Sequence, residues 1–494
     1  MDKKTISVEQ LTFAYPPLVV GGTPEPLFHG LELTVAAGQS LAVVGRSGSG
    51  KSTLTHILAG LAPRYTGGEL TGEVRIGGRD LAAEPPAPTA VGVLFQDAAT
   101  QLFTSAVEDE VAWGLEALGT APTEIGPVVM DALRKFGLLE VSKRPPWALS
   151  GGQQKRLALA SLWALRPRVW LLDEPLGGLD PAGRVEVLAA LTQLRQEGVT
   201  QLFTTARVTR GSWEDSAALL TGGALTAPAT WDSLHAQHAR LVAAGLLCPA
   251  ASWARLERSA RAPGSRLALE ARHLRYAYPD GPAVLHGLDL RIPQGQFVAV
   301  IGPNGAGKST LIRHFNGLLR PTSGSLQVME RKSRGLSVGE LARQVGFLFQ
   351  RPEQQLFATT VREELAYGVR QLRLSNVEKR VERSLARFGL SEIAGRPPAI
   401  LSYGSQRAVT LAALAALETP ILVLDEPTVG LDGRGWAQLL EWVAERRAAG
   451  TTIIVVTHEL ALAARADRVL ALRAGRIAAD GPPDAVLSQF VGEE

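Results

Sequence analysis

Two adjacent carboxylates follow an apolar run at two places in the sequence. VWLLDEP contains Asp173 and Glu174, and ILVLDEP contains Asp425 and Glu426. A carboxylate at the end of a buried strand can hold the hydration shell of Mg²⁺, and its neighbour can orient or deprotonate an attacking water. An apolar run that ends in two acids is by itself often only a strand end. The chemistry therefore requires a phosphate-binding element upstream.

Such an element precedes each acidic pair. GRSGSGKST and GPNGAGKST both fit the pattern G-x-x-x-x-G-K-[ST], each after an apolar strand and before a helical stretch. The glycines allow backbone N–H groups to close around phosphate oxygens at the positive end of the helix. Because two matches occur in register, an accidental glycine-rich turn is a poor explanation. The predicted nucleotide-binding residues are Gly45, Ser47, Gly48, Gly50, Lys51, Ser52 and Thr53 in the first loop, and Gly302, Asn304, Gly305, Gly307, Lys308, Ser309 and Thr310 in the second.

The pattern also assigns roles to single side chains. Lys51 and Lys308 are expected to reach the β- and γ-phosphates of a nucleotide. Tyr15 and Tyr278 precede the two loops at matched places and offer a flat face to adenine, although an isolated tyrosine is more often part of a core. The expected Mg²⁺ ligands are Ser52, Gln96, Asp173, Ser309, Gln350 and Asp425.

An internal sequence repeat covers nearly the whole chain. FQDAATQLFTSAVEDEVAWG from Phe95 returns as FQRPEQQLFATTVREELAYG from Phe349, and LSGGQQKR from Leu149 returns as LSYGSQRA from Leu401. The offset between the copies drifts only from 263 to 252 residues along the chain, so the copies differ by short loop changes. A period this long indicates two tandem domains and not a solenoid.

The elements that position these residues follow from periodicity. Short apolar runs such as SLAVVG and FVAVIG indicate buried strands that each lead into a glycine turn and a helix. Strands that alternate with helices predict an α/β fold with a mainly parallel sheet, and the opening strands of each copy predict an antiparallel appendage. Residues 123–147 and 377–398 are expected to form helical subdomains. We predict domains at residues 1–249 and 267–494, joined by a linker at 250–266.

Composition limits the class of protein. A chain of 494 residues is too long for a single domain. Hydrophobic residues make up 46% of it and charged residues 20%, so each domain can bury an ordinary hydrophobic core. A net charge of +3 is too small to indicate nucleic acid, and a single cysteine, Cys248, suits a reducing cytosol. No signal peptide and no apolar run of the roughly 20 residues that span a bilayer is present. We expect a soluble protein that can still dock to a membrane protein. His235 and His238 are expected to face solvent, because no acidic or cysteine partners accompany them.

At this point the chain resembles the ABC ATPases. The phosphate loop, the glutamine after VLFQ or FLFQ, LSGGQ, the strand ending in DE, the GLD sequence that ends at Asp180 or Asp432, and a later histidine follow in family order. The resemblance implies tandem P-loop NTPase domains of ABC type, with ATP and Mg²⁺ as cofactors. It also implies that the two domains pair head to tail within one chain, so that each ATP lies between one phosphate loop and the other domain's signature. The expected signature contacts are Ser150, Gly151, Gly152 and Gln153, and Ser402 and Gly404.

The two copies differ at functional positions. The second copy has His458, which the resemblance places at the γ-phosphate, where the first copy has Ala206. The second signature reads LSYGS, and its Tyr403 cannot give the close backbone approach of a glycine. Head-to-tail pairing puts both losses in one site. We therefore expect one catalytic site, with Gln350, Glu426, His458 and the intact LSGGQ, and one impaired site, in which Lys51, Asp173 and Glu174 still bind nucleotide and support slow hydrolysis.

The sequence Q-x-x-x-x-Q-L-F followed by acidic residues resembles the ATPase subunits of energy-coupling factor (ECF) transporters, which import vitamins and transition metals. The resemblance implies an integral membrane component and a substrate-binding membrane subunit as partners, at the cytoplasmic face of the membrane, and no nucleic acid. The resemblance also implies that this partner docks through coupling helices rich in arginine, which acidic residues would complement. A solvated acidic face explains the charge equally well. The candidate complementary charges are Glu108, Asp109, Glu110, Glu363 and Glu364. The cargo stays open because a separate subunit selects it.

Two other functions stay open. A soluble twin-ABC ATPase that acts on ribosomes or nucleic acid usually carries a long charged helical linker or zinc modules. The predicted linker here is short, and the chain has no cysteine pair. A regulatory pair that binds ATP without turnover conflicts with the complete catalytic set of the second copy.

Overall fold

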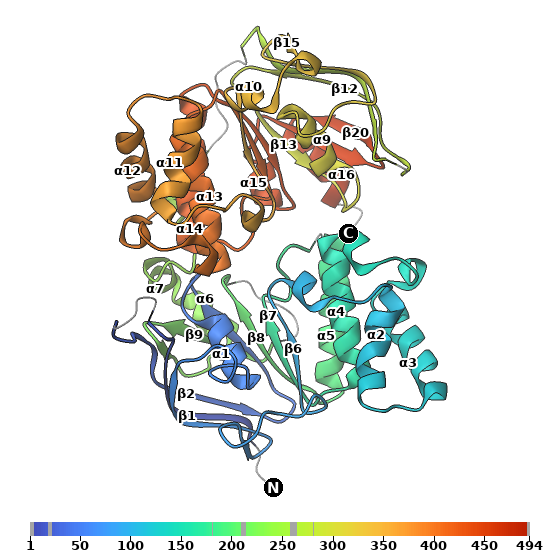
Figure 1. Cartoon of the computed structure of the whole chain (residues 1–494), viewed down its shortest axis with the longest axis vertical. Coiled ribbons are helices and arrows are strands. Elements are labelled where there is room, and N and C mark those ends of the chain that lie inside the picture. The colour runs from blue at the N-terminus through green and yellow to red at the C-terminus, as the bar shows by residue number, and fades with distance from the viewer. Residues whose placement is uncertain are drawn as a thin grey trace. The chain divides into compact units, whose positions relative to one another are not determined.

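The computed structural model describes residues 4–17, 22–179, 181–208, 214–256, 264–279 and 281–491. The chain divides into two compact units, Met1–Leu247 and Cys248–Glu494, called unit 1 and unit 2 below (Figure 1). Asp180, the last residue of the first GLD sequence, and residues 257–263 of the predicted linker lie outside the described residues.

Unit 1 opens with antiparallel strands and continues with alternating strands and helices. Its strands are β1 (Lys4–Ala14), β2 (Pro26–Ala36), β3 (Ser40–Gly45), β4 (Glu69–Ile76), β5 (Arg79–Asp80), β6 (Val91–Leu94), β7 (Val169–Asp173), β8 (Thr200–Thr205), β9 (Ser216–Thr221) and β10 (Ala224–Leu225). Its helices are α1 (Lys51–Leu58), α2 (Val107–Ala117), α3 (Pro122–Lys135), α4 (Gly151–Leu165), α5 (Pro181–Gln196), α6 (Trp231–Ala236) and α7 (His238–Ala243), with short 3₁₀ helices η1 (Ala98–Gln101), η2 (Leu139–Val141) and η3 (Pro146–Ala148).

Unit 2 repeats the order of the strands and begins with a helix, α8 (Ala250–Arg255), ahead of its first strand. Its strands are β11 (Leu267–Ala277), β12 (Ala283–Pro293), β13 (Phe297–Ile301), β14 (Ser323–Val328), β15 (Arg331–Lys332), β16 (Val345–Leu348), β17 (Ile421–Asp425), β18 (Thr452–Val456), β19 (Arg468–Arg473) and β20 (Arg476–Gly481). Its helices are α8 (Ala250–Arg255), α9 (Lys308–Phe315), α10 (Val338–Ala342), α11 (Val361–Gln371), α12 (Val377–Arg387), α13 (Tyr403–Leu417), α14 (Gly433–Ala448), α15 (Leu460–Ala463) and α16 (Pro483–Val491), with 3₁₀ helices η4 (Ser333–Gly335), η5 (Pro352–Gln354), η6 (Ser391–Ile393) and η7 (Pro398–Ile400).

The two units share one sheet topology. Unit 1 has a sheet in the order β6-β7-β8-β3-β9-β10, and unit 2 has the same order in β16-β17-β18-β13-β19-β20. The central strands pair in parallel, and only the last pair of each sheet is antiparallel. A separate antiparallel sheet, β2-β1-β4-β5 or β12-β11-β14-β15, forms the appendage. The predicted α/β fold with tandem P-loop domains is confirmed, and the helical subdomains also take in α2 and α11.

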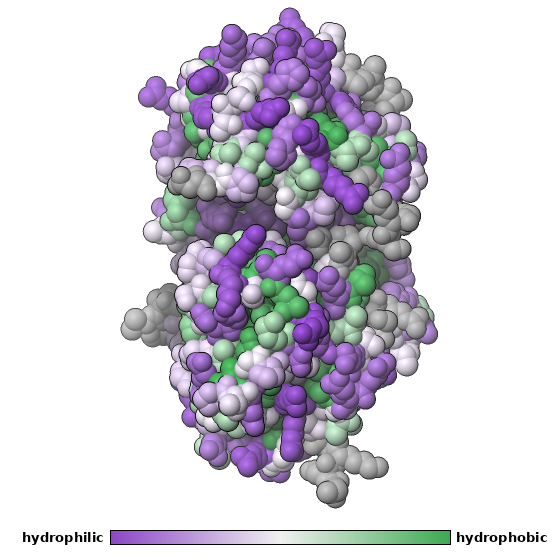
Figure 2. Space-filling view, turned by 90° about the vertical axis from the view of Figure 1, so that its right-hand side faces the viewer, coloured by the Kyte–Doolittle hydropathy of each residue, from purple (hydrophilic) through white to green (hydrophobic). Residues whose placement is uncertain are grey.

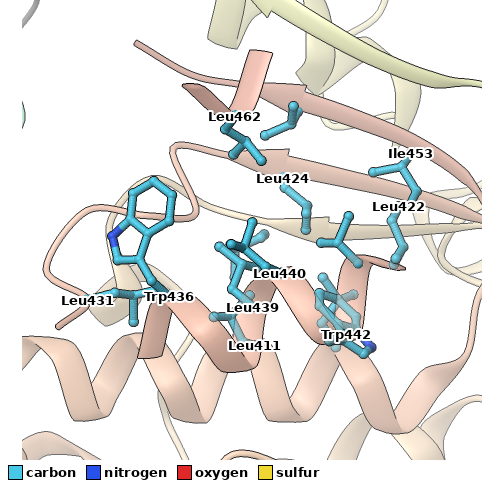
Figure 3. Close-up of a cluster of buried hydrophobic side chains, with 14 of the residues drawn as sticks. Leu411, Leu422, Leu424, Leu431, Trp436, Leu439, Leu440, Trp442, Ile453 and Leu462 are labelled. Atoms are coloured by element: carbon cyan, nitrogen blue, oxygen red, sulfur yellow. The ribbon is translucent and has the colours of Figure 1, made fainter. Parts of the chain in front are cut away.

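The parallel strands are buried on both faces, which explains their continuous apolar sequences. In β17 all five residues are buried. Leu422 and Leu424 point toward α14 and contact Leu439 and Leu440 there (Figure 3). Ile421 and Val423, which alternate with these leucines along the strand, belong to the hydrophobic core on the opposite face of the sheet. The strand therefore delivers Asp425 from a rigid, fully enclosed base.

The first part of the predicted linker is a folded helix. Residues 250–255 form α8, which packs on α14 through Trp253 and Trp436, with ring centroids 5.3 Å apart. Leu256 is fully buried in the same core, and the hydroxyl of Ser252 donates to Glu441. The linker prediction is therefore wrong for residues 250–255. Apolar residues in this stretch are too few to show a helical period in the sequence alone.

Among the described helices, none has both the length and the apolar character that crossing a membrane requires.

Candidate active site

A phosphate loop joins a buried strand to a helix in each unit. In unit 1 it connects β3 to α1, and in unit 2 it connects β13 to α9. Gly50 and Gly307, directly before the helices, have φ values of 98° and 95°, a left-handed conformation that glycine adopts without strain. A Cβ at Gly50 would also lie 2.7 Å from the ring of Phe28, and a Cβ at Gly307 would lie 2.9 Å from Leu285. Only glycine fits these two positions.

The loop lysines are buried inside the loops. Lys51 Nζ donates to the carbonyl oxygens of Gly45 and Arg46, at 2.9 Å each. Lys308 Nζ donates to the carbonyl oxygens of Gly302 at 2.6 Å and Pro303 at 2.9 Å. Each ammonium group is therefore held inside its own phosphate loop.

Asp173 and Asp425 are buried at the carboxyl ends of β7 and β17. The hydroxyl of Thr204 donates to Asp173. Burial raises the pKa of Asp425, and the hydrogen bond from the Ser309 hydroxyl and the charge of Arg313 oppose this shift. A serine hydroxyl beside a buried carboxylate is a donor set that fits Mg²⁺, so the chemistry of these residues suits the expected ion.

Glu174 and Glu426 turn away from their strands with φ values of 49° and 46°. A left-handed backbone is uncommon for residues other than glycine and often marks a functional position. Burial, followed by the charge of Asp425, raises the pKa of Glu426 to about 8. Burial also raises the pKa of Glu174. A carboxylate with a raised pKa is a stronger proton acceptor once it is ionised.

The two glutamates have different neighbours. His458 Nε2 lies 3.4 Å from Glu426 Oε1, and the His458 backbone N–H donates to Glu426 Oε2 at 3.4 Å. Glu174 Oε1 accepts a 2.6 Å hydrogen bond from the backbone N–H of Ala206, whose side chain is only a methyl group. Among the described residues, an imidazole therefore lies beside the glutamate in unit 2 and not in unit 1. Within the described residues, the buried Oε1 of Glu426 accepts no hydrogen bond.

Tyr15 and Tyr278 lie beside the phosphate loops in the same way. Their hydroxyls hydrogen-bond the hydroxyls of Thr53 at 3.1 Å and Thr310 at 3.2 Å. Tyr15 meets the ring of Phe13 edge to face at a centroid distance of 4.9 Å. Both tyrosines keep more than a third of their surface exposed, so an adenine ring has access to them.

The signature serines begin the helices α4 and α13. Ser150 Oγ accepts from the backbone N–H of Gln153 at 3.3 Å, and Gln153 Oε1 accepts from the backbone N–H of Ser150 at 3.1 Å. This reciprocal cap occupies the Gln153 side chain, a role that we did not predict. A Cβ at Gly151 would meet no atom within 4 Å, so the N-terminal turn of α4 is open within unit 1. In unit 2, Ser402 caps α13 through the backbone N–H of Ser405.

The glutamines Gln96 and Gln350 follow β6 and β16, and a second glutamine closes each of these loops. Gln101 accepts from the backbone N–H of Phe95 and donates to the carbonyl of Val93, both at 2.9 Å. In the same way, the Gln355 side chain accepts from the backbone N–H of Phe349 and donates to the carbonyl of Phe347. The Q-L-F sequence therefore has a structural role that the motif alone did not indicate.

Two of the predicted surface charges are buried. Glu110 accepts from the backbone N–H groups of Phe103 at 3.0 Å and Thr104 at 2.9 Å. Glu364 accepts from Phe357 at 2.9 Å and Ala358 at 2.8 Å. Their prediction as charges for a partner is wrong, because both hold the chain ahead of α2 or α11. The helical period of the sequence indicated that Glu110 is buried, since it falls on the same helix face as the buried Val107 and Val111.

His235 and His238 are exposed, on α6 and α7. In the ranges that the structure describes, no group of three or more His, Cys, Asp or Glu side chains is arranged to hold a metal ion.

Within unit 2 the structure brings Lys308, Ser309 and Asp425 together, and Glu426 and His458 complete this cluster. Unit 1 brings together Lys51, Asp173 and Glu174. Together with the fold, these clusters define P-loop nucleotide-binding domains.

Comparison with known proteins gives the family. Residues 28–177 and 285–429 match the ABC transporter family, and the chain belongs to it. A provisionally named ABC transporter ATP-binding protein of Caldanaerobacter subterraneus subsp. tengcongensis is 31% identical over 97% of this chain and 91% of its own. The Bacillus subtilis protein YkoD, provisionally named an HMP/thiamine import ATP-binding protein, is 29% identical over 99% of this chain and 93% of its own. A solved structure of cbiO1 from Clostridium perfringens is 32% identical and covers 46% of this chain and 92% of its own, with a TM-score of 0.41. Membership of the family makes the chain an ATP-binding ATPase.

Proposed function

We propose that the chain is the ATP-hydrolysing subunit of a membrane importer of ECF type, acting in micronutrient uptake at the cytoplasmic face of the membrane. The family supports an ATPase of a transporter, and the name of the Bacillus subtilis relative supports import of a vitamin precursor. The observation that carries the proposal is an exposed aromatic pair that both units present behind the Gln96 or Gln350 loop.

Each aromatic pair is held on a fixed support. In unit 1, Phe103 and Trp113 meet edge to face at 4.9 Å, and in unit 2, Phe357 and Tyr367 meet at 4.6 Å. Phe103 is 61% and Phe357 is 64% exposed, although a buried glutamate accepts a hydrogen bond from the backbone N–H of each. Figure 2 faces the side of unit 1 that bears α2 and α3, and hydrophobic residues there reach the surface among hydrophilic ones. Large exposed aromatics on a rigid support are typical of a protein interface.

Acidic side chains accompany the aromatic pairs. Asp109 in α2 and Glu363 in α11 are exposed one residue before the buried glutamates. Apolar rings with neighbouring carboxylates fit an amphipathic helix that carries arginine, because the rings bury its apolar face and the acids pair with its charge. Such a helix belongs to the membrane component that we propose as the partner, beside a smaller substrate-binding membrane subunit.

The proposal includes one catalytic and one impaired ATP site. The catalytic site takes its phosphate loop, Gln350, Glu426 and His458 from unit 2 and its LSGGQ signature from unit 1. Glu426 accepts the proton of the attacking water, and His458 contacts the γ-phosphate and holds Glu426. The impaired site uses Lys51, Asp173 and Glu174, lacks the imidazole at Ala206, and binds nucleotide with slow hydrolysis.

Mg²⁺ fits the same residues. Ser309, Asp425 and Gln350 would hold the ion in unit 2, and Ser52, Asp173 and Gln96 would hold it in unit 1. When bound, the ion neutralises charge on the β- and γ-phosphate oxygens.

Purification from native membranes tests the transport function. We expect the tagged chain, extracted in mild detergent, to bring down a polytopic membrane protein and a small, very hydrophobic one. The double variant Phe103→Ser with Phe357→Ser should lose both proteins and keep its ATPase activity in solution. Tyr65→Ser is the control, because it removes an exposed ring outside the proposed surface. Recovery of ribosomal proteins or nucleic acid, or of no membrane protein, would contradict the proposal.

A further inference from the structure

Tyr403, which replaces a signature glycine, is folded into the site of its own unit. Its hydroxyl donates to the carbonyl oxygen of Gln350 at 3.3 Å. Its ring also covers the turn after Glu426, since a Cβ at Gly430 would lie 2.4 Å from the ring. One side chain thus connects the start of α13 with the Gln350 loop and with the turn that follows the catalytic glutamate.

Arg407, one turn later on α13, holds the same loop. Its side chain is fully buried, and its guanidinium donates to the carbonyl of Phe349 at 2.6 Å and to the carbonyl of Gln350. It also donates to the Tyr403 hydroxyl at 3.4 Å and lies over the tyrosine ring, 5.9 Å from its centroid. The planar guanidinium presents several donors in fixed directions, so it can fix two successive carbonyls at once.

Unit 1 is built differently at the aligned positions. Gly151 has no side chain there, and Lys155 replaces the arginine. Lys155 Nζ donates to the carbonyl oxygens of Glu174 and Gly177, at 2.8 Å each. The first signature helix is therefore hydrogen-bonded to the turn after its glutamate, whereas the second is hydrogen-bonded to the Gln350 loop. This difference coincides with the two sites that we propose to be unequal.

We propose that Tyr403 and Arg407 are positioning residues for Gln350 in the phosphate site of unit 2. They fix the peptide that carries Gln350, which is itself an exposed side chain and has to be held accurately to act on a nucleotide. The tyrosine that weakens one signature thus supports the other site. The proposal rests on the proposed function, because that function assigns Gln350 to the catalytic site.

The test combines turnover with amide exchange. Tyr403→Phe removes only the hydroxyl, and Tyr403→Gly with Ser405→Gln recreates the LSGGQ sequence. We expect kcat to fall about fivefold in the first variant and tenfold or more in the second, with the KM for ATP changed less than twofold. Arg407→Lys should give an intermediate loss. Tyr65→Phe, which removes an exposed hydroxyl elsewhere, is the control.

Hydrogen exchange of the nucleotide-free chain gives a readout that does not depend on activity. The amides of residues 346–356 should exchange about five times faster in Tyr403→Phe, and those of the matched residues 92–102 in unit 1 should not change. If the recreated LSGGQ sequence keeps or raises kcat, or if exchange at 346–356 is unchanged, the positioning role is refuted. Glu426→Gln in the turnover assay separates the positioning role of Tyr403 from the proposed catalytic site. If Glu426→Gln retains turnover, the assignment of the catalytic site fails. The hydrogen-exchange result alone then decides whether Tyr403 positions the Gln350 loop.

Discussion

Glu174 and Glu426 show how far a motif determines a single side chain. The sequence predicted both residues directly after a buried strand, and the structure has them there with nearly equal φ values. The phosphate-loop and DE motifs specify backbone geometry. The positions of the loop glycines and of the acids at the strand ends could therefore be predicted from the sequence. Contacts between side chains were predicted less well. The spacing S-x-x-Q from Ser150 to Gln153 is a capping-box signal, but we assigned both residues to nucleotide binding alone.

Cys248 gives a prediction at the residue scale. Burial, followed by the charge of Glu441, raises the pKa of its thiol to about 11. Because the thiolate is the reactive form, the rate of alkylation of the native protein should rise about tenfold per pH unit from pH 7 to 10. The unfolded chain, with an ordinary thiol pKa near 8.5, should react faster and level off near pH 9. Alkylation with iodoacetamide at several pH values measures both rates. A native rate that also levels off near pH 9 would show that Cys248 is not shielded.

At the scale of elements, the helices α2 and α11 each hold the preceding turn in place and also present an exposed surface. Their buried glutamates fix the preceding turn, and their exposed rings face outward. The acidic sequences VEDEV and VREEL indicated only a charged stretch. Which glutamate turns inward follows from the helical period, and the backbone N–H groups that it meets belong to a loop whose path no periodicity predicts.

Removal of one buried carboxylate tests this support. Glu364→Ala leaves the N–H groups of Phe357 and Ala358 without their acceptor. We expect the free energy of unfolding of unit 2 to fall by about 2–4 kcal/mol, because each orphaned donor loses a charge-assisted hydrogen bond. Urea unfolding of the full chain measures the loss. Glu363→Ala changes the exposed neighbour and should cost less than about 1 kcal/mol. Similar costs for the two variants would mean that Glu364 does not support the turn.

At the scale of the whole molecule, the internal repeat predicted two units of one topology. The boundary was predicted less well, because α8 consists of six residues and becomes part of unit 2 only through contacts with α14, more than 180 positions later in the chain. The repeat also located the inequality between the copies, at Ala206 and Tyr403. It could not indicate that Tyr403 contacts the Gln350 loop of its own unit, since that contact depends on tertiary packing.

The central claim is that the two ATP sites are unequal, and one comparison of variants tests it most directly. We would measure steady-state ATPase activity of the full chain with Glu426→Gln and, separately, with Glu174→Gln. Loss of the proton acceptor should lower kcat by at least 100-fold in Glu426→Gln. Glu174→Gln should lower kcat only a few fold, because unit 1 supplies the impaired site. Equal losses in the two variants, or a larger loss in Glu174→Gln, would contradict the account.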